Sequence, residues 1–242
     1  MIVLATQWMH SANHQPEALE VLARMVLPSK KIAVPAEFMA ITGMTWSDLD
    51  VEVFSLLNID QEIVGLNKPI FVNISPETLE DPATFALCAD LLSDLVARKR
   101  ARVVVEVPCK SPLQGDRLAH VLGVLHAGDI AVAIDDYGVE HSTRERLDSQ
   151  HWDYCKVNLS TLKFTPDLEW LLRLDRTCAE RGTKIVFERL ERIQDIDVLK
   201  AFPAAWIQGY AMSRPELPGG VDAVIRRSVT RIKDFGFLPK AI

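Results

Sequence analysis

The sequence of 242 residues lacks paired cysteines, long apolar runs and an excess of basic residues. Its four cysteines lie far apart and form no CxxC pair, which argues against a zinc site or a disulfide framework. No apolar run approaches the roughly 20 residues that a membrane helix needs, and no basic segment precedes the apolar N-terminal residues. We therefore expect a cytoplasmic protein that does not bind a membrane.

The net charge argues against a second class of partner, polymeric nucleic acid. Lys and Arg number 27 against 33 Asp and Glu, which gives a formal net charge of -6. A surface for polymeric DNA or RNA depends on clustered Lys and Arg, so such a surface is not expected. A small phosphate ligand can still bind to an acidic protein if a metal ion supplies positive charge locally.

The fold class follows from short β-branched runs that alternate with helical patterns. Five nearly continuous apolar runs, at 70–74, 102–107, 130–134, 153–157 and 184–187, are typical of strands buried on both faces. Helices are predicted at 82–98, after Asp81 as N-cap, and at 166–181, before Gly182. Such alternation fits a barrel or an open parallel sheet. No GxGxxG or GxxxxGK[ST] segment follows a strand, so we favour a single (β/α)8 barrel domain over residues 1–242.

Polar residues stand where five of the predicted strands end. They provide an amide, four carboxylates and an ammonium: Asn73, Glu106, Asp135, Asp136, Lys156 and Glu188. Each alone is commonly a helix cap or a solvated loop residue. In a parallel barrel, however, the C-terminal strand ends form the active face, so we expect all six at one rim.

The composition of this rim indicates chemistry with hard cations. The neighbouring carboxylates of Asp135 and Asp136 repel each other, and a bound cation relieves that repulsion. Carboxylate and amide oxygens without His or Cys favour Mg²⁺ or Mn²⁺. Two such ions can activate a water and stabilise both oxygens of a phosphodiester, while Lys156 orients the water or offsets charge on phosphorus.

Seven short motifs in order resemble the EAL domain family. They are EVLARM at 20–25 ahead of PAEF at 35–38, VNIS at 72–75, EVPC at 106–109, DDYG at 135–138, CKVN at 155–158, ERLE at 188–191 and QGY–SRP at 208–215. The letters EAL also occur at 17–19, but the distance to PAEF assigns the functional glutamate to Glu20 instead. In this register Glu20, and not Glu17, corresponds to the functional glutamate of the family.

The resemblance implies a modified (β/α)8 barrel that forms a homodimer and hydrolyses cyclic di-GMP to linear pGpG with Mg²⁺ or Mn²⁺. Implied metal ligands are Glu20, Asn73, Glu106, Asp135, Asp136 and Glu188. Implied catalytic residues are Lys156, Glu188, Glu191 and Glu20. Implied substrate-binding residues are Gln7, Leu22, Arg24 and Gln208.

Several positions near these ligands depart from the family pattern: Pro108, Cys109, Val139, Glu140, Asn158 and Arg189. Glu140 and Arg189 stand where the family has glycines. The substitution at position 140 therefore removes a residue that tolerates positive φ. Misplacement of a ligand by about 1 Å can cost roughly 100-fold in rate. Three hypotheses therefore remain: an active phosphodiesterase, a domain that binds cyclic di-GMP without cleaving it, and a protein-interaction domain.

Overall fold

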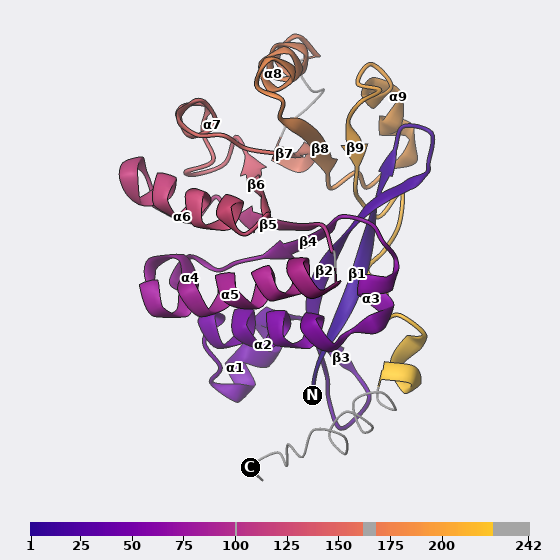
Figure 1. Ribbon diagram of the computed structural model, residues 1–242. Coiled ribbons are helices and arrows are strands. Elements are labelled where there is room, and N and C mark those ends of the chain that lie inside the picture. Colours follow the sequence, from indigo (N-terminus) through magenta and orange to yellow (C-terminus); the bar gives the residue numbers. More distant parts are fainter. Residues whose placement is uncertain (100, 162–167, 225–242) are drawn as a thin grey trace.

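The computed structural model describes residues 1–99, 101–161 and 168–224, and these form a closed barrel wrapped by helices (Figure 1). The barrel strands are β1 (Ile2–Ser11), β2 (Pro16–Val26), β4 (Ile70–Asn73), β5 (Val103–Val107), β6 (Ala131–Tyr137), β7 (Tyr154–Asn158), β8 (Lys184–Glu188) and β9 (Trp206–Ile207). The predicted barrel is therefore confirmed. The prediction that one domain extends to residue 242 reaches beyond the described residues.

Strand order makes this a modified barrel. The sheet runs β1-β9-β8-β7-β6-β5-β4-β2, and pairing of β1 with β2 closes the ring. Strand β1 is antiparallel to both of its neighbours, whereas β2 and β4 to β9 run parallel to one another. The short β3 (Ile32–Ala33) extends the edge of β2 outside the ring. The C-terminal ends of the parallel strands thus share one rim.

Helices cover the outside of the barrel. They are α1 (Pro35–Thr42), α2 (Trp46–Ile59), α3 (Gln61–Gly65), α4 (Pro76–Glu80), α5 (Pro82–Lys99), α6 (Gly115–Ala127), α7 (Arg144–Ser149), α8 (Leu168–Arg181) and α9 (Ile196–Leu199), with 3-10 turns at Leu159–Thr161 and Ile193–Asp195. No helix among the described residues is long and apolar enough to cross a membrane.

Element boundaries follow the sequence closely, with one exception that matters. Asp81 caps α5 as predicted, because its Oδ2 accepts the Thr84 amide at 2.9 Å. Helix α8 ends at Arg181, directly before Gly182, which has φ 72°, while residues 166 and 167 of the predicted helix lie outside the described residues. The prediction that β6 ends before the aspartate pair is wrong, since β6 continues to Tyr137 and carries both aspartates within the strand.

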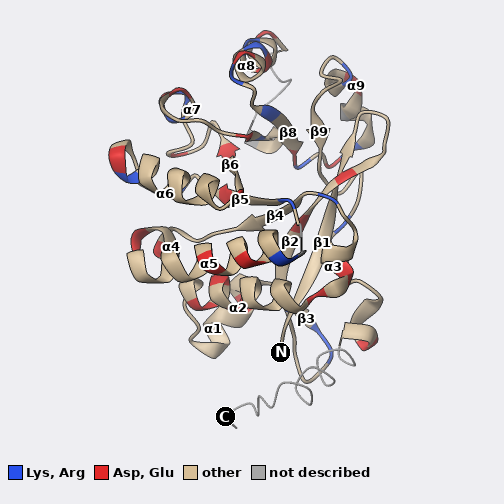
Figure 2. Ribbon diagram, viewed as in Figure 1, with Lys and Arg blue, Asp and Glu red and all other residues tan. Residues whose placement is uncertain are grey.

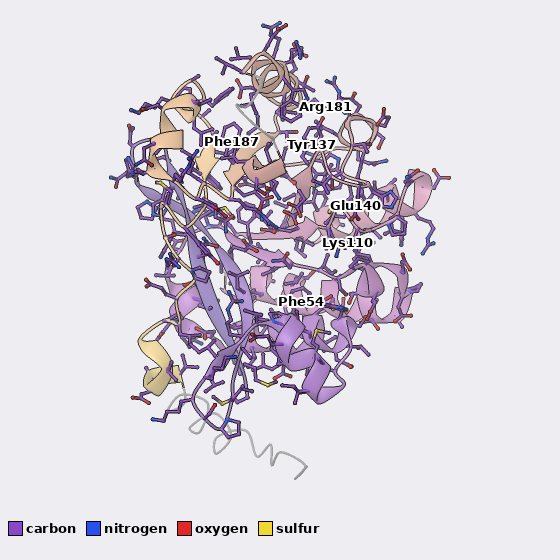
Figure 3. All side chains as sticks on the ribbon, turned by 180° about the vertical axis from the view of Figure 1, so that it is seen from behind. Phe54, Lys110, Tyr137, Glu140, Arg181 and Phe187 are labelled. Atoms are coloured by element: carbon purple, nitrogen blue, oxygen red, sulfur yellow. The ribbon has the colours of Figure 1, made fainter. Side chains whose placement is uncertain are left out.

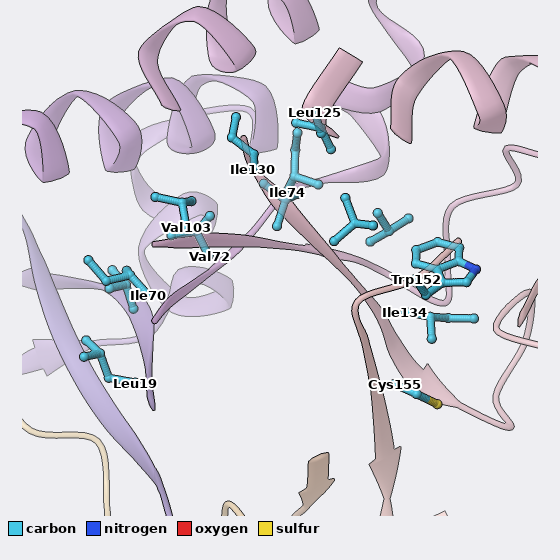
Figure 4. Packing of buried hydrophobic residues seen from close by; sticks show 14 of the residues in the cluster. Leu19, Ile70, Val72, Ile74, Val103, Leu125, Ile130, Ile134, Trp152 and Cys155 are labelled. Atoms are coloured by element: carbon cyan, nitrogen blue, oxygen red, sulfur yellow. The ribbon is translucent and has the colours of Figure 1, made fainter. Parts of the chain in front are cut away.

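On the outer face of the barrel, apolar side chains of the strands pack against apolar side chains of the surrounding helices (Figure 4). The buried Trp152 donates its indole N–H to the carbonyl of Arg146 at 3.0 Å, so its one polar atom is satisfied. The inside of the barrel holds a separate apolar cluster: Met9, Ala18, Phe71, Val104, Ala133, Val186 and Trp206, with Ala131 and Tyr154 against it. Aromatic rings fill its centre, with Phe71 and Tyr154 centroids 4.9 Å apart.

The interior cluster determines which residues face the rim. Strand side chains alternate between faces, so a residue two positions beyond an interior residue also points inward. In the direction of the rim, that position is polar in every barrel strand: Gln7, Glu20, Asn73, Glu106, Asp135, Lys156, Glu188 and Gln208. Strand β1 runs in the opposite direction, so Gln7 precedes its interior residue. The barrel therefore has an apolar floor beneath a polar layer.

Candidate functional site

The polar layer lines a cavity of about 350 Å³ at the C-terminal rim. Its walls include every predicted metal ligand, Lys156 and Glu191, together with Gln7 and Gln208. Figure 2 shows acidic positions on β5 and β6, the strands that carry Glu106 and the aspartate pair. The structure thus brings together all but two of the predicted site residues.

Lys156 occupies the centre of this layer and is only 2% exposed. Its Nζ lies 2.6 Å from Glu106 Oε2, 3.3 Å from Asp135 Oδ1, 3.5 Å from Glu188 Oε2 and 3.7 Å from Glu20 Oε2. Burial disfavours the ammonium, but the surrounding carboxylates outweigh that effect and hold the pKa of Lys156 well above its ordinary value. Lys156 is therefore charged at neutral pH.

One ammonium does not balance the four carboxylates around it. Burial, assisted by the charge of Glu20, raises the pKa of Glu106 well above its ordinary value. Burial also raises the pKa of Glu188 to about 8, although Lys156 opposes the rise. Carboxyls in such surroundings ionise readily only when a further positive charge enters the cavity.

Buried oxygens without partners indicate the same need for positive charge. Glu106 Oε1, Glu188 Oε1 and Gln208 Oε1 are buried and accept no hydrogen bond. Buried acceptors are normally satisfied, and oxygen atoms of this kind are the ligands that hard cations prefer. The residues present therefore fit one or two divalent cations.

Glu20 is held in place from both sides. Its Oε1 accepts a hydrogen bond from Asn73 Nδ2 at 2.7 Å, and its Oε2 accepts one from Gln208 Nε2 at 2.6 Å. Gln7 is anchored by its own Nε2, which donates to the carbonyl of Ser213 at 2.9 Å. Glu17 lies three positions before Glu20 on the same strand, so its side chain points to the opposite face.

Leu22 and Arg24 lie outside the central cavity, in a neighbouring depression of about 560 Å³. Asn73 lines both hollows, so they adjoin. Trp46 also lines the depression and is 43% exposed. A ligand longer than the cavity can extend from the carboxylates toward an arginine and an indole.

Two of the substituted positions meet at Asp136. Asn158 Nδ2 donates to Asp136 Oδ1 at 2.7 Å, and Cys109 Sγ lies 3.8 Å from Asp136 Oδ2. Burial, and then the charge of Asp136, raises the pKa of the Cys109 thiol to about 11, so this group is neutral at neutral pH. Asp136 is thus contacted by two neutral groups.

Two other substituted positions have left-handed backbone. Glu140, in the loop after β6 (Figure 3), has φ 44°, and Arg189, directly after β8, has φ 59°. Residues with a Cβ rarely adopt this conformation, which costs roughly 1–2 kcal/mol each. Arg189, which the sequence placed near the predicted ligands, lines the cavity, and so does Tyr210, which was not among the predicted site residues.

Comparison with known proteins identifies this arrangement. The model of the EAL domain matches residues 6–215. The chain belongs to the EAL domain family. It is 27% identical over 212 residues to the protein named probable cyclic di-GMP phosphodiesterase PdeG from Escherichia coli (strain K12), covering 81% of this chain and 41% of that protein. The chain therefore spans less than half the length of this curated relative.

Solved structures of other proteins share the barrel. An EAL domain protein from Listeria monocytogenes EGD-e has a TM-score of 0.75 at 18% identity, covering 94% of this chain and 93% of that chain. Klebsiella pneumoniae BlrP1, solved with manganese and cyclic di-GMP, has a TM-score of 0.73 at 21% identity, covering 88% of this chain and 56% of that chain. At these identities the likeness establishes the fold.

Proposed function

We propose that this chain is a metal-dependent phosphodiesterase that hydrolyses cyclic di-GMP to linear pGpG with Mg²⁺ or Mn²⁺. The observation that carries this proposal is the ring of four carboxylates around the buried Lys156, with partnerless oxygens on Glu106 and Glu188. The similar BlrP1 was solved with cyclic di-GMP and either manganese or calcium, which supports a divalent cation at the corresponding rim.

The proposed ligands divide into two overlapping sets that share Asp135. Glu20, Asn73, Glu106 and Asp135 would hold one cation, and Asp135, Asp136 and Glu188 the other. Such ions, when bound, lower the pKa of a coordinated water and neutralise charge that develops on a phosphodiester. Asn73 and Gln208 fix Glu20 beforehand through their hydrogen bonds to its two oxygens.

Lys156 is the proposed catalytic residue for the attacking water. Its charged ammonium is confined among the carboxylates and excluded from bulk solvent, so it presents N–H donors at a defined point. It can orient the water and stabilise the extra negative charge of a pentacoordinate phosphorus. Glu191, on the wall of the same cavity, completes the polar surroundings.

The adjoining depression supplies the proposed binding site for the rest of the ligand. Arg24 offers a planar cation for a phosphate oxygen, and the exposed indole of Trp46 offers a face for a purine base. Leu22 contributes apolar surface to the same depression. Cyclic di-GMP carries two guanine bases and two phosphates, so it is large enough to reach both hollows.

A second candidate function is binding of cyclic di-GMP without cleavage. The left-handed Glu140 and Arg189 and the neutral partners of Asp136 favour it, because they alter the surroundings of the second proposed cation. A protein-interaction domain is the third candidate. We further propose that residues 1–242 form one domain and that the protein is a cytoplasmic homodimer. Its proposed partner is cyclic di-GMP, and we expect it to bind neither polymeric nucleic acid nor a membrane.

One experiment separates the three candidates. The full chain is incubated with cyclic di-GMP and Mn²⁺ or Mg²⁺, pGpG is followed by chromatography, and binding is measured in Ca²⁺ by calorimetry. Binding together with pGpG is the result that we expect. Binding without pGpG in either metal would overturn the enzyme in favour of the binding domain, and no binding would leave the protein-interaction domain.

A further inference from the structure

A second cluster of metal-binding side chains lies at the opposite end of the barrel. His126 is on the last turn of α6, His151 is in the segment before β7, and Asp153 directly precedes β7. One ligand atom from each lies within 4.8 Å of the others. Since β7 carries Lys156 near its C-terminal end, this cluster at its start is separated from the catalytic cavity by the apolar floor.

The carboxylate of Asp153 is fixed in orientation before any ion binds. Its Oδ2 accepts the backbone N–H of Val132 at 2.8 Å and lies 2.9 Å from His126 Nε2. The backbone of Asp153 is held as well, because its N–H donates to Val132 and its carbonyl accepts from Lys184. Metal-binding carboxylates in proteins are typically supported by outer hydrogen bonds of this kind.

Both imidazoles turn toward this carboxylate. His151 Nε2 lies 3.7 Å from Asp153 Oδ1, and the two imidazole centroids are 5.5 Å apart. An ion pair of His126 with Asp153 would account for two of the three residues. It would not account for His151, whose Nε2 lies beyond hydrogen-bond distance of Asp153 Oδ1. A bound cation would be coordinated by one nitrogen of each imidazole and by a carboxylate oxygen.

We propose that His126, His151 and Asp153 bind a divalent transition metal, with Zn²⁺ as the representative ion. Two imidazoles and one carboxylate form a ligand set typical of Zn²⁺, Ni²⁺, Cu²⁺ or Fe²⁺, unlike the oxygen-only set of the catalytic cavity. With ligand bonds of about 2.0–2.2 Å in a tetrahedral site, two ligand atoms of one ion stand roughly 3.4 Å apart. The side chain of His151 is 59% exposed, so its ring can move inward to reach this distance.

The proposed ion would connect α6 to the strands on which the catalytic aspartates and Lys156 lie. His126 belongs to α6, while Asp153 accepts a hydrogen bond from Val132 of β6 and directly precedes β7. A metal ion that binds only the folded state stabilises that state by mass action. We therefore expect Zn²⁺ to raise the thermal transition of the full chain. The absence of a CxxC pair argues against a cysteine-based zinc site, and the proposed site uses no cysteine.

The test is a Co²⁺ titration of the full chain in excess Mg²⁺, which occupies sites for hard cations. Co²⁺ held by imidazoles gives visible absorption, and Zn²⁺ should abolish it by competition. His151→Ala and Asp153→Asn should weaken Co²⁺ binding at least about tenfold. The exposed His120 lies on α6 outside the cluster, so His120→Ala serves as matched control and should bind as the wild type does.

A variant of the catalytic cavity makes the outcome decisive. Glu106→Gln should leave the Co²⁺ absorption unchanged if the ion sits at the histidine cluster. Loss of the signal in Glu106→Gln with retention in His151→Ala would place the ion in the catalytic cavity and overturn the proposal. Equal affinities in wild type and His151→Ala, or no visible absorption at all, would also overturn it. Circular dichroism checks that each variant folds.

Discussion

Lys156 Nζ lies 2.6 Å from Glu106 Oε2 inside the barrel, where both side chains are almost completely buried. This contact joins β5 to β7, and three further carboxylates approach the same ammonium. Buried ions are costly unless they are paired, and one ammonium cannot balance four carboxyls when all of them ionise. The arrangement is therefore poised to accept additional positive charge.

Removal of Lys156 should destabilise the metal-free protein and abolish turnover. In Lys156→Met the carboxylates lose the ammonium that lies among them, and breaking a buried pair typically costs about 3–5 kcal/mol. We expect Mn²⁺ to recover part of the loss. Urea unfolding with and without Mn²⁺ measures both effects, and the exposed Lys200→Met is the control. An unchanged urea midpoint for metal-free Lys156→Met would contradict the role given to this residue.

Arg189→Gly should stabilise the fold, because glycine adopts φ 59° without the penalty that a Cβ imposes. We expect a gain of about 1 kcal/mol in the free energy of unfolding. Arg189→Ala removes the same side chain but keeps the Cβ, so it should give no such gain. Glu140→Gly, at φ 44°, should behave like Arg189→Gly. Equal urea midpoints for the Gly and Ala variants would show that the backbone is not strained.

Asn158→Asp should increase the affinity for the second proposed cation. The amide of Asn158 now donates to Asp136 Oδ1, and a carboxylate there would instead add negative charge beside Asp136. We expect calorimetry to show tighter Mn²⁺ binding and metal-free unfolding to show lower stability. Asn58→Asp, on α2 away from the cavity, is the control. Weaker Mn²⁺ binding in Asn158→Asp would contradict the proposed position of that cation.

Asp50 should give stability a defined pH dependence. Its Oδ2 accepts the Ser75 amide and the Thr78 hydroxyl, both at 2.7 Å, and burial raises the pKa of Asp50 above its ordinary value. Folding then favours the protonated carboxyl, so its contribution is complete below about pH 3.9 and declines as pH rises toward the folded pKa. Asp50→Asn should lack this decline. A wild type that gains stability relative to Asp50→Asn as pH rises would contradict this sign.

The sequence predicted much of the site because strand alternation is a local property. Asn73, Glu106, Lys156 and Glu188 each follow a buried β-rich run, so their position at one rim needed little beyond strand direction. The end of β6 was misplaced because acidic residues are rare inside strands, yet here Asp135 and Asp136 extend the strand into the cavity.

Relationships between distant segments were beyond the sequence alone. Cys109 and Asn158 both contact Asp136, which only the closed barrel reveals. The exposure of Trp46 depends on how α2 packs against α5, β1 and α4, and a tryptophan read from the sequence carries no such information. The proximity of His126 and His151 could not be predicted either, because it depends on the end of α6 lying beside the start of β7.

The most direct test of the central claim compares pGpG production by Glu20→Ala and Glu17→Ala in the presence of Mn²⁺. Glu20 points into the cavity between Asn73 and Gln208, whereas Glu17 lies on the opposite face of β2. The proposed function predicts that wild type and Glu17→Ala convert cyclic di-GMP to pGpG and that Glu20→Ala does not. Turnover retained in Glu20→Ala and lost in Glu17→Ala, or absent from the wild type with both Mn²⁺ and Mg²⁺, would contradict it.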